Sequence, residues 1–299
     1  MRSWREAWVY GFIGMAIFSA SMPATRVAVL AFDPLFLTSA RAAIPGVLSI
    51  AALGLLRAPW PSARDWLRLA VVAAGVVLGF PLLSALALTR ITSAHSLIWI
   101  GLLPLATALC GVALAGERLP ARFWAFAGLG AACVAGFAAS RSSGGEAAGD
   151  VLMAAAVLSA GVGYAEGAIL SRRLGGWQVI CWALVVSLPF SVPFAFALQP
   201  ADWPPLSAPG WWGLAYVSLF SMWIGFVFWY RGLALGGIAA VGQLQLLQPF
   251  FGLVISALVL RERVSPATFA VAAAVLACVF AARRASLTPR VKVEAVGSA

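Results

Sequence analysis

Two stretches of the sequence, residues 104–118 (PLATALCGVALAGER) and residues 249–263 (PFFGLVISALVLRER), follow the same pattern. Each begins at a proline, continues as an apolar run, and reaches a Glu-Arg pair in which the glutamate is thirteen residues after the proline. Such a run supplies most of a membrane-spanning helix, because a bilayer core requires about 20 apolar residues. The two stretches therefore predict a membrane protein built from two related halves.

The composition of the whole chain agrees with this prediction. Of its 299 residues, 63% are hydrophobic and 10% are charged, whereas an ordinary soluble domain has about 25% charged residues. This excludes a soluble enzyme, a disordered chain and a disulfide-framed secreted domain. The apolar runs are long and continuous, which favours helices over the alternating strands of a membrane β-barrel.

We predict an all-α polytopic membrane protein with ten transmembrane helices. Each half contains five helices, an odd number, so the second half enters the membrane from the opposite side. The fold class is therefore two inverted five-helix repeats around a central cavity, an arrangement that places a transporter's substrate site between the repeats. The predicted spans are residues 7–25, 34–56, 67–88, 93–115, 121–139, 149–170, 177–198, 210–231, 236–260 and 266–283.

The least hydrophobic connection is RSSGGEAAG, close to the middle of the chain. Its glycine and serine residues are typical of a flexible link. We therefore predict a first repeat over residues 1–140, a linker over 141–149, a second repeat over 150–285, and a cytoplasmic tail over 286–299.

The positive charges predict the orientation. With a cytoplasmic amino terminus, fourteen of the twenty Lys and Arg residues lie on the cytoplasmic side, as the positive-inside rule requires. Both termini are then cytoplasmic. The net charge of +10 comes from arginines scattered at the ends of apolar runs, which is typical of membrane edges and does not indicate nucleic-acid binding.

Several motifs resemble the EamA family of the drug/metabolite transporter superfamily. They are FSASMPATR at Phe18–Arg26, Arg41 seven residues after Pro34, the two Pro…Glu-Arg segments, and Ser171-Arg172-Arg173 at the end of the sixth span. Departures from the family pattern are Phe18 and Tyr164 in place of tryptophan, and Pro23. Within the family, the chain is most similar to YddG-type amino-acid exporters.

This resemblance implies a cavity lined mainly by spans 1, 3, 4, 6, 8 and 9. It implies a secondary transporter of the bacterial inner membrane that exports amino acids or similar small metabolites by alternating access. The expected partners are a small-molecule substrate and the lipid bilayer, with the chain as a monomer or homodimer. A multidrug exporter of lipophilic cations is the alternative, and a membrane-embedded enzyme or sensor is a second one.

His95, the single histidine, and Trp99 share one helix face because they are four residues apart. They are candidates for binding substrate in the cavity; alternatively, His95 bonds a carbonyl or water near the end of its span. Tyr164 is a candidate for stacking, because the family often has tryptophan there.

Glu166 is an acid well inside a predicted span, where ionisable groups are costly and often functional. It is a candidate for proton coupling or for binding a substrate amine. Alternatively, it lies near the cytoplasmic end, where it meets water or pairs with Arg172 or Arg173.

Polar and aromatic residues of the last spans are further candidates for substrate binding. Gln245 and Gln248 lie about 60° apart on a helix and are expected to face the cavity, with interhelical hydrogen bonding as the alternative. Ser221 and Trp229 lie on a helix stripe whose other residues are mostly small.

Arginine and proline residues complete the candidates. Arg26 and Arg41 are expected either to bind a substrate carboxylate from an outer vestibule or to snorkel to the membrane surface. Pro81, Pro104 and Pro249 bend their helices and act either as hinges or as static kinks.

Motifs for other chemistry are missing from the sequence. It contains no Walker-type phosphate loop, and a single histidine excludes the zinc motif His-Glu-x-x-His. The sequence therefore predicts no cofactor, no metal site and no enzyme activity.

Overall fold

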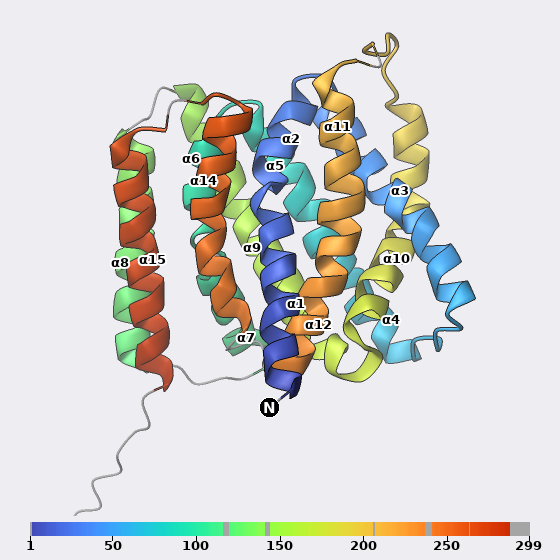
Figure 1. The fold of residues 1–299 in the computed structure, drawn as a ribbon, viewed down its shortest axis with the longest axis horizontal. Helices are drawn as coiled ribbons and strands as arrows, with labels where there is room; N and C mark the ends of the chain where they lie inside the picture. The colour runs from blue at the N-terminus through green and yellow to red at the C-terminus, as the bar shows by residue number, and fades with distance from the viewer. Residues whose placement is uncertain are drawn as a thin grey trace, which may run out of the picture.

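The computed structural model describes residues 2–115, 120–140, 144–205, 207–236, 241–262 and 264–287. Within these ranges the chain forms helices and no strand, and the helices stand side by side as a bundle (Figure 1). The elements are α1 (Arg2–Ser19), α2 (Ser21–Val29), α3 (Pro34–Leu55), α4 (Ala63–Val72), η1 (Ala73–Gly79), α5 (Phe80–Leu88), α6 (Ser93–Ile100), α7 (Leu103–Ala115), α8 (Ala121–Ser140), α9 (Gly144–Leu174), α10 (Gly176–Ala197), α11 (Pro209–Ala215), η2 (Tyr216–Ile224), α12 (Gly225–Gly236), η3 (Gly242–Leu247), α14 (Gln248–Val259) and α15 (Pro266–Leu287).

Seven helical segments in the described ranges are long and apolar enough to cross a membrane. Three shorter apolar helices, 121–137, 244–259 and 266–278, occupy the remaining predicted spans. The predicted polytopic all-α fold is therefore confirmed.

The helix contacts repeat with a period of five spans. Spans 2 and 7 pack together as α3 and α10, and spans 5 and 10 pack together as α8 and α15. The contact of α1 with α12 has its counterpart five spans on, where α9 packs against η1 and α5. The pair α8 and α15 lies at one side of the bundle (Figure 1). This pattern is what two five-helix repeats facing each other produce.

Five spans are interrupted part-way along their length. Span 1 breaks at Ala20, between α1 and α2, and span 4 breaks at Gly101, between α6 and α7. Spans 3 and 8 contain the π-helices η1 and η2, and span 9 contains the 3-10 helix η3. A proline follows the interruption in four cases, because it has no N–H to donate to the preceding turn. Three are the predicted Pro81, Pro104 and Pro249. The fourth is Pro23, which lies three residues after Ala20, as Pro104 lies three residues after Gly101.

The segment between the repeats differs from the prediction. α9 begins at Gly144, so residues 144–149 of the predicted linker form its first turns. Glu146 lies in the first turn, where a carboxylate interacts favourably with the helix dipole. At the other end of the chain, α15 continues to Leu287, and the rest of the predicted tail lies outside the described residues.

The two repeats approach closely at Gly75 in η1. A Cβ atom at Gly75 would lie 2.8 Å from the Gly163 Cα and 2.8 Å from the Ser159 carbonyl oxygen, both on α9. Because these are backbone atoms, we expect Gly75→Ala to destabilise the protein by about 1–3 kcal/mol. Thermal unfolding in detergent measures this. Gly54→Ala is the control, because nothing lies within 4 Å of its Cβ position; equal melting temperatures for the two variants would contradict the prediction.

Candidate functional site

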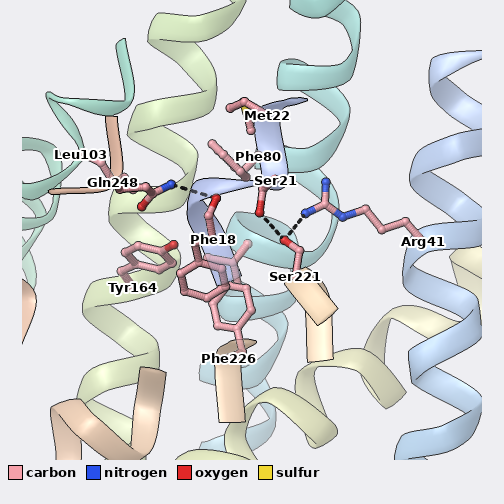
Figure 2. Close-up of a pocket in the computed structure, with 11 residues that line it drawn as sticks. Phe18, Ser21, Met22, Arg41, Phe80, Leu103, Tyr164, Ser221, Phe226 and Gln248 are labelled. Atoms are coloured by element: carbon pink, nitrogen blue, oxygen red, sulfur yellow. Dashed lines mark hydrogen bonds between the residues drawn. The ribbon is translucent and has the colours of Figure 1, made fainter. Parts of the chain in front are cut away.

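A cavity lies where the interrupted spans meet, with an empty volume of about 380 Å³ that includes space open to solvent. The wall is largely apolar, with a few polar groups (Figure 2). The lining residues are Phe18, Ser21, Met22, Arg41, Val76, Phe80, Leu103, Tyr164, Ser221, Phe226 and Gln248.

Arg41, on α3, is the cationic group of this wall, and it is 3% exposed. Its Nη2 donates a hydrogen bond of 3.1 Å to the Ser221 hydroxyl, which lies 2.7 Å from the Ser21 hydroxyl (Figure 2). The Nε atom of Arg41 has no hydrogen-bond partner, and among the described residues no acid lies within ion-pair distance of it. The structure therefore places Arg41 in the cavity wall and not at the membrane surface.

Gln248 lies on the other side of the cavity, at the start of α14 (Figure 2). Its Nε2 donates to the Phe18 carbonyl oxygen at 3.3 Å, a carbonyl that lies beside the break in span 1. Its Oε1 is buried and accepts no hydrogen bond. The cavity thus holds an unused donor at Arg41 and an unused acceptor at Gln248.

The structure brings four of the other predicted site residues together here. Tyr164 and Ser221 line the cavity, and Gln245 is buried beside the Tyr164 hydroxyl. Trp229 lies behind the wall, with its ring centroid 6.1 Å from that of Phe18 and 6.5 Å from that of Tyr164.

Three predicted site residues lie elsewhere. His95 and Trp99, on α6, both contact Asp150 of α9 and do not line the cavity. Glu166 is also outside the lining, and its Oε2 lies 3.7 Å from Nη1 of Arg68. The partner of Glu166 is therefore Arg68, not Arg172 or Arg173 as the alternative interpretation expected.

Arg26, the other arginine considered for carboxylate binding, forms a hydrogen bond with a backbone carbonyl group. Its Nη1 donates to the Leu88 carbonyl oxygen, and its side chain is not part of the cavity wall.

Three ion pairs join the first half of the chain to the second half. Arg68 pairs with Glu166, and Asp65 accepts two hydrogen bonds from Arg173 at 2.7 and 2.8 Å. These two pairs lie at the end of the bundle where α1 begins, which we call the terminal end. The third pair, between His95 and Asp150, lies at the opposite or far end.

Sequence reasoning missed several residues of the site. Ser21 and Phe18 border the break in span 1, and Pro23, three residues after Ala20, is the sequence signal that could have located it. Val76 and Phe226 are ordinary apolar residues, and only the packing of separate spans places them at the cavity. Asp150 was missed because it lies at the edge of a span, where a carboxylate needs no special explanation.

Comparison with known proteins adds an independent line of evidence. The model of the EamA-like transporter family matches residues 6–138 and residues 147–283. The chain is 58% identical to "Uncharacterized transporter YdeK" of Bacillus subtilis (strain 168) over 284 residues, which cover 95% of this chain and 99% of that protein.

A solved structure titled "Crystal structure of protein" has a similar fold. Its TM-score is 0.67 at 22% identity, and the match covers 96% of this chain and 100% of that one. The fold, the internal repeat and these matches together show that the chain belongs to the EamA-like transporter family.

Proposed function

We propose that this transporter exports amino acids, or similar small metabolites carrying a carboxylate and an amine, across the bacterial inner membrane. The observation that carries the proposal is Arg41, a buried cation in the cavity wall without an acidic partner among the described residues. A buried charge without a partner costs several kcal/mol. A substrate carboxylate would supply the missing anion, and guanidinium suits a carboxylate because it can donate two parallel hydrogen bonds.

Gln248 supports an amine at the other end of the substrate. Its buried Oε1 has no donor in the structure, and an ammonium group would provide one. The apolar wall between them, with Phe18, Phe80 and Phe226, suits an uncharged side chain. One arginine provides one positive charge, which fits a monocarboxylate better than a phosphate ester.

Alternating access is supported by the two-repeat architecture. The cavity draws its lining from both repeats, and ion pairs join the repeats at both ends of the bundle. Rocking of one repeat against the other would break the contacts at one end while keeping those at the other. We infer that the terminal end faces the cytoplasm, from the distribution of positive charge.

Export of lipophilic cations is the second candidate, and it would use an acid in the cavity. Glu166 is buried, but it lies beside Arg68 and outside the lining. Among the described residues that line the cavity there is no acid, and this favours amino acids.

Competition in proteoliposomes tests the proposal. Counterflow of radiolabelled leucine is measured against three unlabelled competitors: leucine, its des-amino analogue 4-methylpentanoate, and its decarboxylated analogue 3-methylbutylamine. We expect leucine to compete best, 4-methylpentanoate second and 3-methylbutylamine least. The remaining amino acids are screened in the same way. If the protein takes up tetraphenylphosphonium specifically, and no amino acid inhibits this uptake, the results would instead support the cation exporter.

A further inference from the structure

His95, Trp99 and Asp150 form a polar cluster at the far end of the bundle, separate from the cavity. The Nε2 of His95 lies 2.8 Å from Oδ1 of Asp150. The indole Nε1 of Trp99 donates a hydrogen bond of 2.7 Å to the same oxygen. The His95 ring also packs edge-on against Phe137, with 5.1 Å between the ring centroids. None of these residues lines the cavity.

The cluster is buried, and not all of its polar atoms have a hydrogen-bond partner. The exposed fractions of the His95 and Asp150 side chains are 3% and 7%. Oδ2 of Asp150 has no hydrogen-bond partner, and the His95 Nε2 contact meets the distance of an ion pair without the alignment of a hydrogen bond. A buried carboxylate is costly unless a positive charge or a proton compensates it. One proton added to this pair therefore removes its net charge.

Other charged residues of the described ranges lie near the cluster, but none of them forms an ion pair with His95 in place of Asp150. Among the described residues, Asp150 is the acid within ion-pair distance of His95. α5 and α14 carry no charged residue, and α15 carries charge only in its last turn, at the terminal end. The remaining charged groups at this end of the elements around α6 are Arg26 on α2, Arg90 before α6, Glu146 on α9, and Arg261 and Glu262 after α14.

The cluster joins the two repeats. His95 belongs to the first matched repeat and Asp150 to the second. A second link lies next to it: Glu262 of the second repeat accepts hydrogen bonds from the backbone N–H groups of Ser93 and Ala94, at 3.1 and 2.9 Å. The start of α6 is thus held by two acids of the opposite repeat.

The two ends of the bundle differ in how their links respond to a proton. At the terminal end the cations are Arg68 and Arg173, and arginine stays charged at every physiological pH. At the far end the basic partner is a histidine, the residue type whose charge can change within the physiological range of pH. Among the three ion pairs described here, the pair of His95 and Asp150 is therefore the one whose attraction requires a proton on a histidine.

We propose that His95, Asp150 and Trp99 form a proton-binding site that controls separation of the two repeats at the far end. With a proton bound, the imidazolium attracts the carboxylate and holds this end closed. When the proton leaves to water, the attraction between opposite charges is lost, and the far end opens more readily. This proposal rests on the proposed alternating access, and with cytoplasmic termini the site senses external pH.

The first experiment uses the fact that the chain has a single histidine. The protein is labelled with ¹³Cε1-histidine, purified with a tag that contains no histidine, and followed by NMR as the pH is changed. We expect one imidazole signal whose position changes with pH. In Asp150→Asn, the response of this signal to pH should differ from that of the wild-type chain, because the opposite charge is lost. Trp99→Phe is the matched control, because it keeps both partners of the ion pair.

The second experiment measures the far end directly. Spin labels are placed at the exposed residues Leu30 and Val151 of a cysteine-free chain, and their distance is measured at about pH 5.5 and about pH 8.5. We expect a larger population of long distances at the higher pH, and no dependence on pH in His95→Gln or in Asp150→Asn.

Neither experiment needs a substrate, so both report on this site even if leucine is not transported. A His95 signal that does not titrate would overturn the proposal. A far-end distance that is the same at both pH values, or that changes equally in the two variants, would also overturn it. Size-exclusion profiles show whether each variant is folded; if Asp150→Asn is not, His95→Gln supplies the comparison of distances.

Discussion

Replacing Arg41 with glutamine is expected to lower leucine transport by about 30-fold or more. Removing one partner of a buried charge pair costs at least about 2 kcal/mol, and each 1.4 kcal/mol is about tenfold in affinity. The loss should appear mainly in KM at low substrate concentration, because Arg41 lines the cavity and would hold the substrate carboxylate. Initial rates of counterflow in proteoliposomes measure it.

Two further variants separate the role of the guanidinium from the loss of a charge. Arg41→Lys keeps the charge but not the fork, so we expect an intermediate loss. Arg26→Gln removes an equal charge from α2, away from the cavity wall, and should change KM for leucine much less. Equal KM values for Arg41→Gln and Arg26→Gln in folded protein would show that Arg41 does not bind the substrate.

Replacing Gln248 with leucine is expected to weaken leucine transport by about tenfold. A hydrogen bond to a charged group is worth about 1.5–3 kcal/mol, and the unpartnered Oε1 of Gln248 is the acceptor available for the substrate amine. The variant should therefore lose the difference between leucine and 4-methylpentanoate as competitors. The wild-type chain should retain that difference.

Gln199→Leu is the matched control for this prediction, because Gln199 is exposed beyond the end of α10. It should leave both inhibition constants unchanged. If Gln248→Leu weakens leucine and 4-methylpentanoate by the same factor, Gln248 shapes the cavity and does not bind the amine.

The spans were the part of the fold that the sequence predicts best. Long apolar runs placed the starts at Pro34, Ser93 and Pro266 without error, because each follows a short polar connection. The repeated Pro…Glu-Arg segments predicted the two repeats, and the described contact pattern and the family match agree with them.

The helix interruptions were predicted only where a proline marks them. Pro81, Pro104 and Pro249 each indicate a bend, and Pro23 stands in the same relation to the break at Ala20 as Pro104 does to the break at Gly101. The π-helix η2 contains no proline, and hydrophobic periodicity does not reveal it. The cavity lies at these interruptions, so its wall was only partly predictable.

Residue partners were the least predictable feature. His95 and Glu166 were identified as unusual because they are ionisable groups in apolar runs. Their partners, Asp150 and Arg68, lie on helices of the opposite repeat, and no local spacing connects such positions. Arg41 is expected from the sequence either to bind a substrate carboxylate from an outer vestibule or to snorkel to the membrane surface, whereas the structure places it in the cavity wall with Ser221 as its hydrogen-bond partner.

The central claim is that two repeats, linked by ion pairs at both ends, move against each other around one shared cavity. Two cysteine-free, doubly spin-labelled proteins test it most directly. One carries labels at Leu30 and Val151 of the far end, and the other carries labels at the exposed Arg57 and Arg172 of the terminal end. Distance distributions are recorded in lipid with and without a mixture of the twenty amino acids. The account predicts opposite changes, so that long distances become more populated at one end as they become less populated at the other. Distances that stay the same at both ends, or that lengthen at both ends together, would contradict it.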